Sequence, residues 1–345
     1  MINYVYPEKL PSKKARSVSA VNTACELSKM VNTTFYYEKS GKEILEFYGL
    51  TCKNLNLVPV SKKFIFRSNK IFHFNLKNKI NDDIFYVRHL KVAKELIKQN
   101  KKVIFEIHEI FSDINPKVHM LEKFVYEHAS GIVCVNQVVK KECLRKFNVK
   151  APIKVIYNGC GFNVDFIQKD FTHVNEMFYI GSSQKWKGVE FLLNTMKHLD
   201  ISLKIVGDAA SMEAEQSNVD LLGFKSKEEV LTILENSKLT VIPNLPYKES
   251  FFSVPIKLFE YMRTSNIVVS SDFEPIREII HDKENGFLFK AGDEDSFIDT
   301  VNYIRSLPPK KLQEIAHNAY ETSKEFTWEK RAEKIVAFTK EVMVK

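Results

Sequence analysis

The chain has 345 residues, of which 44% are hydrophobic and 27% are charged, and its formal net charge at pH 7 is +8. This length fits two domains of ordinary size, and the composition excludes a disordered or fibrous protein. No apolar run reaches the ~18 residues of a membrane-spanning helix, and the first residues lack the layout of a signal peptide.

Short apolar segments typical of buried strands alternate along the chain with segments of helical periodicity. The strands are predicted at residues 2–6, 84–87, 102–107, 131–135, 154–157, 177–180, 202–206, 238–242 and 267–270, and the first is expected to stop at Pro7. Helices are predicted at residues 18–30, 85–99 and 188–197. This alternation predicts an α/β fold with parallel sheets covered on both faces, whose ligands bind at the carboxyl ends of the strands.

A loop at residues 158–172, which leads into a new strand, is the predicted hinge between two domains. We therefore expect an N-terminal domain at residues 1–165, a C-terminal domain at residues 166–325, and a last helix at residues 326–345.

The positive charge is concentrated in the first half. Residues 1–165 hold 28 Lys and Arg against 15 Asp and Glu, and the remaining residues hold 23 against 28. The first half is thus expected to face an anionic partner, either a membrane surface or an anionic acceptor. Nucleic acid ranks last among the three candidate partners and is not expected, because no nucleic-acid motif accompanies the charge.

Residues 60–80 interleave basic and aromatic side chains, namely Lys62, Lys63, Arg67, Lys70, Lys77 and Lys79 with Phe64, Phe66, Phe72 and Phe74. Such a segment suits an anionic membrane surface. A basic strand pair with one buried face is the alternative.

The five cysteines are Cys25, Cys52, Cys134, Cys143 and Cys160. Their odd number and the lack of a Cys-x-x-Cys spacing argue against a disulfide framework and against a zinc site. A reduced, cytoplasmic protein is expected, with Cys134 as part of the core.

Three predicted strands of the second half end in glycine, at Gly181, Gly207 and Gly223. A glycine at such an end lets the backbone approach a ligand closely. Lys187 follows the first of them just before a helix, where it can meet a phosphate as a point charge. A turn at each glycine and a surface lysine are the simpler alternatives.

The segment from Ser253 to Met262 predicts a helix with Ser253 as its N-cap and Pro255 in its first turn. Its core stripe is predicted to be Ile256, Phe259 and Met262. Lys257 and Glu260 lie three residues apart and project from one face. The helix N-terminus beside a lysine favours a phosphate, and the carboxylate can accept hydrogen bonds from sugar hydroxyls. A solvated surface pair is the alternative.

Taken in order, these motifs resemble those of the retaining glycosyltransferases of family four, which have the GT-B fold. Three further segments are similar to family elements: the strand that leads to His108, Asn158-Gly159 between the domains, and Asn285-Gly286 before a late strand. The resemblance implies two Rossmann-like domains that face each other across a cleft, with a last helix that crosses back to the first domain.

The resemblance also implies roles for individual residues. Lys187 would hold the donor diphosphate, Glu260 would bind the ribose, and His108 would lie near the transferred sugar. The implied donor site comprises Gly181, Ser182, Lys187, Gly207, Gly223, Pro255, Ile256, Lys257 and Glu260. No metal and no cofactor are expected, because lysines and a helix N-terminus can stabilise the leaving diphosphate. A satisfied histidine at a strand end is the alternative for His108.

Two positions depart from the family pattern. Ser182 stands where an arginine is usual, and Phe252 stands where a second glutamate often precedes Glu260. We hypothesise that Lys257 replaces the missing arginine. In the first loop, Arg16 and Ser17 are candidates to hold an anionic acceptor, with a flexible basic loop as the alternative.

The predicted function is therefore transfer of a sugar from a nucleotide diphosphate sugar to a hydroxyl of a cell-surface glycan or lipid-linked acceptor, in polysaccharide biosynthesis. The alternatives are a non-catalytic GT-B scaffold in a glycan-assembly complex and a nucleotide-sugar epimerase. A cytoplasmic location is expected, with peripheral docking on the inner membrane as a further expectation from the charge.

Overall fold

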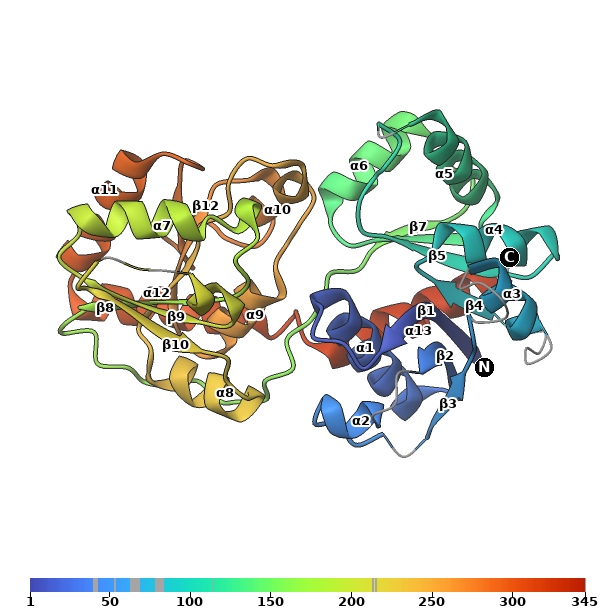
Figure 1. Ribbon diagram of the computed structural model, residues 1–345, viewed down its shortest axis with the longest axis horizontal. Helices are drawn as coiled ribbons and strands as arrows, with labels where there is room; N and C mark the ends of the chain where they lie inside the picture. The colour runs from blue at the N-terminus through green and yellow to red at the C-terminus, as the bar shows by residue number, and fades with distance from the viewer. Residues whose placement is uncertain are drawn as a thin grey trace. The chain divides into compact units, whose positions relative to one another are not determined.

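The computed structural model describes residues 1–39, 43–52, 54–62, 69–77, 84–113, 115–212, 214 and 216–344. The chain forms two compact units, which we describe separately (Figure 1). Unit 1 comprises Met1–Gly159 and Trp328–Lys345, and unit 2 comprises Cys160–Thr327. The predicted domain boundaries, 165/166 and 325/326, fall a few residues away from these limits. The last helix belongs to unit 1.

Unit 1 is built on a parallel sheet of seven described strands in the order β3-β2-β1-β4-β5-β6-β7. The strands are β1 (Ile2–Leu10), β2 (Thr33–Lys39), β3 (Leu55–Pro59), β4 (Ile84–Val87), β5 (Val103–Ile107), β6 (Gly131–Cys134) and β7 (Ile153–Val155). The helices are α1 (Ala15–Met30), α2 (Ile44–Phe47), α3 (Asn69–Lys77), α4 (Leu90–Lys98), α5 (Pro116–His128), α6 (Gln137–Lys146) and α13 (Trp328–Val344).

Helices α1 and α13 pack together over one face of this sheet (Figure 1). Ala24 of α1, Ile335 of α13 and Ile104 of β5 belong to the same buried cluster. Phe105 points to the opposite face, because side chains alternate along a strand, and there its ring lies 5.6 Å from that of Tyr126 in α5. The sheet is thus covered on both faces, as the alternation of elements predicts.

Strand β1 does not stop at Pro7 as predicted but continues to Leu10. Its pairing with β2 shifts between Tyr6 and Lys9, so that Pro7 and Glu8 lie in the irregularity. A proline is tolerated at such a bulge because its missing N–H would have no ladder partner there. Strands β2 and β3 were not predicted.

The basic and aromatic segment lies only partly within the described residues. Lys63, Phe64, Phe66, Arg67 and Lys79 fall outside them. Residues 69–77 form helix α3, so the alternative of a strand pair is wrong for this part. Lys62 is buried with its Nζ 3.9 Å from a Glu38 carboxylate oxygen, whereas Phe74 is exposed.

The expectation that the chain has no disulfide is wrong, because Cys25 of α1 bonds to Cys52. The two residues are separated by 27 positions, and the contact of α1 with β3 brings their segments together. This proximity is a tertiary effect without a local spacing signal. Cys134, Cys143 and Cys160 are free thiols whose pKa values are raised by burial.

Unit 2 contains a parallel sheet of six described strands in the order β10-β9-β8-β11-β12-β13. The strands are β8 (Glu176–Ile180), β9 (Ser202–Val206), β10 (Val219–Gly223), β11 (Leu239–Ile242), β12 (Ile267–Ser271) and β13 (Phe287–Phe289). The α-helices are α7 (Val189–Thr195), α8 (Lys227–Asn236), α9 (Ile256–Arg263), α10 (Glu274–Arg277), α11 (Glu294–Ser306) and α12 (Pro309–Ser323). The 3₁₀ turns are η1 (Lys185–Lys187), η2 (Met196–His198), η3 (Asp208–Ser211) and η4 (Lys248–Phe251).

The segment that enters unit 2 is fixed by the buried Lys169. Its ammonium donates to the carbonyl oxygens of Leu234, in the last turn of α8, and of Ser237, just after that helix, and to Asn266 Oδ1 before β12. Burial lowers the pKa of Lys169 to about 7. These bonds satisfy carbonyls that the end of α8 leaves without helical partners. In the part of the chain that the structure describes, no helix has both the length and the apolar character needed to cross a bilayer.

Candidate active site

The three glycines predicted to end strands do so on the adjacent strands β8, β9 and β10. The Gly181 N–H donates to Val206 O at 2.9 Å, and the Gly207 N–H donates to Gly223 O at 2.9 Å. Gly207 has φ +109°, and a Cβ built on it would lie 2.4 Å from Gly181 O. Only glycine fits there, so the backbone at the carboxyl edge of this sheet is held close together.

The loop after β8 carries Lys187 to the same edge of the sheet. Gly188 has φ +72°, and a Cβ on it would lie 1.9 Å from the carbonyl oxygen of Pro243, just after β11. Leu245 N–H also donates to Trp186 O at 2.8 Å. The loops that follow β8 and β11 are therefore packed against each other, and Lys187 is held between them.

The ammonium of Lys187 lies 3.7 Å from the centroid of the Trp186 ring. Burial lowers the pKa of this lysine to about 8. The ring covers one side of the cation without neutralising it. A partly desolvated ammonium of this kind gains more from an anionic ligand than a solvated one does.

Helix α9 begins at Ile256 after Pro255, and Ser253 does not cap it, so the predicted N-cap is wrong. The ring of Pro255 clashes with the backbone of Val254 in helical conformation, because the residue before a proline is restricted to extended angles. The helix therefore cannot start at Val254. The core face consists of Leu258, Phe259, Tyr261 and Met262, whereas Ile256 is only half-buried, so the predicted stripe is correct for two of its three members. Phe252 lies half-buried between η4 and this helix.

Tyr261 anchors α9 to the end of β8. Its hydroxyl accepts from Ile180 N–H at 3.0 Å, one residue before Gly181. The bond fixes α9, which carries Lys257 and Glu260, to the end of the strand that leads to Gly181. Lys257 Nζ lies 2.7 Å from Glu260 Oε2, and the carboxylate is the more buried partner, with 15% of its side chain exposed against 34%.

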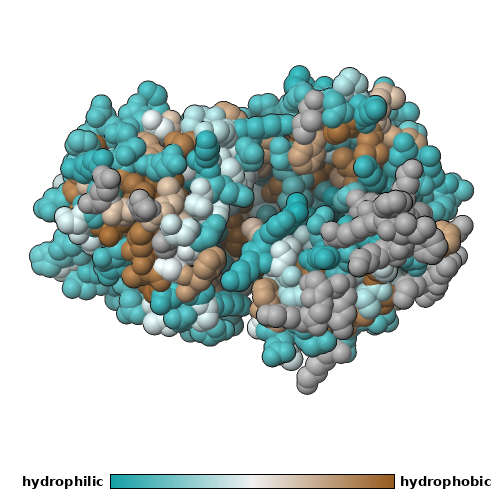
Figure 2. Space-filling model, in the orientation of Figure 1, coloured by the Kyte–Doolittle hydropathy of each residue, from teal (hydrophilic) through white to brown (hydrophobic). Residues whose placement is uncertain are grey.

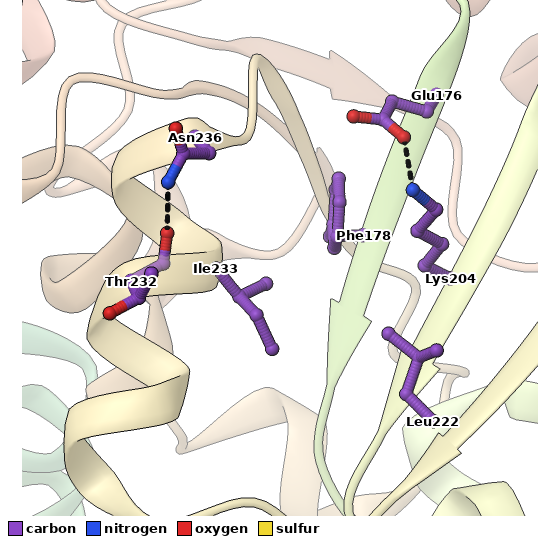
Figure 3. A pocket seen from close by; sticks show the side chains of 7 residues that line it. All are labelled: Glu176, Phe178, Lys204, Leu222, Thr232, Ile233 and Asn236. Atoms are coloured by element: carbon purple, nitrogen blue, oxygen red, sulfur yellow. Dashed lines mark hydrogen bonds and ion pairs between the residues drawn. The ribbon is translucent and has the colours of Figure 1, made fainter.

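A pocket of about 310 Å³ occurs elsewhere in unit 2, between α8 and the face of the sheet (Figure 3). It is lined by Glu176, Phe178, Lys204, Leu222, Thr232, Ile233 and Asn236. Lys204 Nζ pairs with Glu176 Oε2 at 2.6 Å beside it. None of the predicted donor-site residues lines this pocket. Figure 2 shows apolar residues exposed on unit 2 within a mostly hydrophilic surface.

In unit 1, His108 follows β5 directly, with 30% of its side chain exposed. Its Nε2 donates to Glu106 Oε1, and its Nδ1 accepts from Arg88 Nη2 at 3.3 Å. Burial and the charge of Arg88 lower the pKa of His108 to about 4, so the ring is neutral at pH 7. The sequence prediction missed Arg88, which follows β4 on the adjacent strand.

The carboxylate of Glu106 is fully buried and lies at the centre of this cluster. Its Oε2 accepts from Tyr86 Oη and lies 2.8 Å from Arg331 Nη2 of α13. Burial opposes ionisation, but Arg331, His108 and Arg88 together hold the pKa of Glu106 well below its usual range. The sequence signal for such a cluster was a glutamate inside the apolar run of residues 103–107. No sequence pattern pointed to its partner Arg331, which is far away along the chain.

The two acceptor-side candidates differ in exposure. Arg16 is exposed, with its Nη2 3.6 Å from Glu8 Oε2, and its backbone oxygen accepts from Arg88 Nη1 at 3.1 Å. Ser17 is buried, and its hydroxyl lies 3.1 Å from that of Tyr6. Only Arg16 therefore has a side chain placed to meet a ligand from solvent.

Two family models together match most of the chain. Residues 17–161 match the model described as Glycosyltransferase Family 4, and residues 164–322 match that described as Glycosyl transferases group 1. An uncharacterized glycosyltransferase of Methanocaldococcus jannaschii is 26% identical over 217 residues, which are 60% of this chain and 58% of the relative. The chain thus spans less than two thirds of that curated relative.

Solved structures share the fold over nearly the whole chain. The Anabaena protein HepE in complex with UDP superposes with a TM-score of 0.79 at 14% identity, over 99% of both chains. Sucrose-phosphate synthase of Thermosynechococcus elongatus superposes with a TM-score of 0.79 at 13% identity, also over 99% of both chains. The α/β fold of two parallel sheets is that of GT-B glycosyltransferases. By its sequence matches in both units and by its fold, the chain belongs to the group 1, family-four glycosyl transferases.

Proposed function

We propose that this protein transfers a sugar from a nucleotide diphosphate sugar to a hydroxyl of a cell-surface glycan or lipid-linked acceptor, with retention of configuration. One observation carries the proposal: the glycine ends of β8, β9 and β10 and the loop that bears Lys187 meet at one edge of the unit 2 sheet, and Tyr261 joins α9 to the end of β8 there. HepE, which shares the fold, has been solved with UDP and with UDP-glucose. Retention rests on the family resemblance alone.

The chemistry at this edge follows from the charge that develops on the leaving group. As the glycosidic bond breaks, the diphosphate becomes more negative, and fixed positive charge lowers the barrier. We propose that Lys187 and Lys257 supply this charge and that Glu260 accepts hydrogen bonds from the ribose. His108 would contact the transferred sugar.

We propose that the reaction needs no metal ion, because two lysines and a helix N-terminus serve the diphosphate. The Asp-x-Asp triplet of the chain, Asp293 to Asp295, opens α11. There Asp293 caps the helix by accepting from Ser296 N–H and pairs with Lys290 Nζ at 2.8 Å. These contacts give Asp293 a structural role, which supports the proposal.

The excess of basic residues in the first half supports an anionic acceptor and docking on the inner face of a membrane. Arg16 is the exposed side chain beside the His108 cluster that could meet such an acceptor. A cytoplasmic location would give the enzyme access to nucleotide sugars.

Ser182 and Phe252, which depart from the family pattern, favour a second candidate: a non-catalytic scaffold that keeps the fold. Incubation with radiolabelled UDP- and GDP-sugars and lipid-linked acceptors, followed by product analysis, separates the candidates. A labelled glycan supports transfer, and an isomerised nucleotide sugar would mean an epimerase. Nucleotide binding without turnover over the whole panel would favour the scaffold.

Replacing Lys257 with alanine tests whether this residue compensates for the missing arginine. The change removes a cation and leaves Glu260 without its partner at 2.7 Å, near the proposed diphosphate. Isothermal titration should show about tenfold weaker binding of the nucleoside diphosphate, which corresponds to about 1.4 kcal/mol. Lys311→Ala is the matched control, because Lys311 forms the same i,i+3 pair with Glu314 on α12. Equal affinities of the two variants would refute the hypothesis.

A further inference from the structure

Both ring nitrogens of His108 are engaged by protein groups. Nε2 donates to Glu106 Oε1, and Nδ1 accepts from Arg88 Nη2 at 3.3 Å. A neutral imidazole has one donor and one acceptor nitrogen, so this pair of contacts selects the tautomer with the proton on Nε2. Neither nitrogen is then available for proton exchange with a substrate, although the ring edge is exposed.

The charge balance around His108 disfavours a third cation. Arg88 and Arg331 share the carboxylate of Glu106, with distances of 3.7 and 2.8 Å to its oxygens. Arg88, Glu106 and Arg331 act on the His108 ring, and Tyr4 and Tyr86 act on Glu106. These groups come from β1, β4 and the residue after it, β5 and α13. Protonation of His108 would place three cations against one carboxylate in a buried cluster.

Arg88 is itself held in place. Its side chain is only 8% exposed, its Nη1 donates to Arg16 O at 3.1 Å, and its guanidinium lies 5.8 Å from the centroid of the Tyr6 ring. Its planar fork can therefore reach the loop at Arg16, Glu106 and His108 from one position. A lysine in its place would carry the charge but could not hold all these contacts at once.

We propose that Arg88 is a positioning residue that, with Glu106, holds His108 as a neutral Nε2–H imidazole with fixed orientation and excludes it from acid–base chemistry. The role in transfer rests on the proposed function, in which His108 contacts the sugar. His108 would then contact the sugar as a rigid, uncharged ring whose orientation is fixed by its two hydrogen bonds. Arg88 would not contact the substrate.

Nitrogen NMR of the histidine-labelled full chain tests the proposal without an activity assay. The chain has nine histidines, and His108→Asn identifies the signals of His108. In the wild type, His108 should show the Nε2–H tautomer and should not titrate between pH 5 and 8.5. In Arg88→Met, the midpoint should rise by at least one pH unit and the tautomers should mix. Arg88→Lys should retain the low midpoint but lose the single tautomer.

Arg145→Met is the matched control, because Arg145 is a solvent-exposed arginine of the same unit. In Arg145→Met, the signals of His108 should equal those of the wild type.

An unchanged tautomer and titration midpoint of His108 in Arg88→Met would overturn the proposal. If the methionine variant does not fold, a single Nε2–H tautomer in Arg88→Lys would overturn it instead. In the transfer assay, Arg88→Met should lower kcat about tenfold with an unchanged donor Kd. If the wild type transfers no sugar, the proposed function fails while the NMR result still decides the role of Arg88.

Discussion

Replacing Arg331 with methionine should lower the free energy of unfolding of unit 1 by about 3–5 kcal/mol, the usual cost of breaking a buried ion pair. The guanidinium is fully buried and lies 2.8 Å from Glu106 Oε2. It also donates to the carbonyl oxygens of Ile156 and Tyr157 and to Thr23 Oγ1. Methionine fills similar volume but leaves a buried carboxylate and two carbonyls without this partner.

The two tryptophans of the chain allow this effect to be measured in unit 1, because Trp328 lies in α13 and Trp186 lies in unit 2. In a Trp186→Phe background, urea unfolding followed by Trp328 fluorescence should show a lower midpoint. Arg145→Met is the control and should change the free energy of unfolding by less than ~0.5 kcal/mol. A loss below ~1 kcal/mol for Arg331→Met would contradict this account of the cluster.

The same experiment has a predicted pH dependence. The pKa of Glu106 is held well below its usual range in the folded protein, so its ionised contacts stabilise the fold above the unfolded-state pKa of about 4.3. This stabilisation is lost as pH falls through the folded-state pKa. In Arg331→Met the pKa of Glu106 should rise, and protonation in acid should relieve the unpaired charge. The difference between wild type and variant should therefore shrink below about pH 5.

Replacing Lys187 with alanine should lower kcat/KM for sugar transfer by about 10²–10³-fold, the range for removal of a group that stabilises developing charge. Its backbone is held between the loops that follow β8 and β11, and its ammonium lies over the Trp186 ring, so the charge has a fixed position. Steady-state kinetics with a saturating acceptor measure the effect. Lys185→Ala, which removes an exposed cation from the same 3₁₀ turn, should stay within about twofold of the wild type.

Lys187 also predicts a pH profile. Its pKa is lowered to about 8 in the free protein, so its charge is lost as pH rises through 8. The kcat/KM of the wild type should fall above pH 8, because this ratio reports the free enzyme. Lys187→Ala should lack this fall. A variant that keeps both the rate and the alkaline limb would remove Lys187 from the proposed mechanism.

Much of unit 2 could be predicted because its signals are local. Strands β8, β9 and β10 are apolar runs followed by glycine, and parallel pairing brings their carboxyl ends to one edge. The start of α9 was misplaced because Ser253 is a good cap by residue type, whereas the backbone restriction before Pro255 decides the boundary.

The cluster in unit 1 could not be predicted in full, because its partners are distant in sequence. Glu106 and Arg331 meet only because α13 returns to pack on α1. The Cys25–Cys52 disulfide likewise depends on tertiary packing rather than on a spacing pattern. His108 was identified by resemblance to a family, yet the contacts that fix its protonation state come from Arg88 on the neighbouring strand.

The most direct test of the central claim is calorimetric titration of UDP and GDP and their common sugar conjugates into the wild type, Glu260→Ala and Glu314→Ala. Glu314 is the matched control, because it is the glutamate of another i,i+3 lysine pair on a helix of unit 2. We predict that one nucleotide binds the wild type and Glu314→Ala with equal affinity and binds Glu260→Ala at least tenfold more weakly. Absence of binding to the wild type, or equal binding to all three proteins, would contradict a donor site at this edge of the sheet.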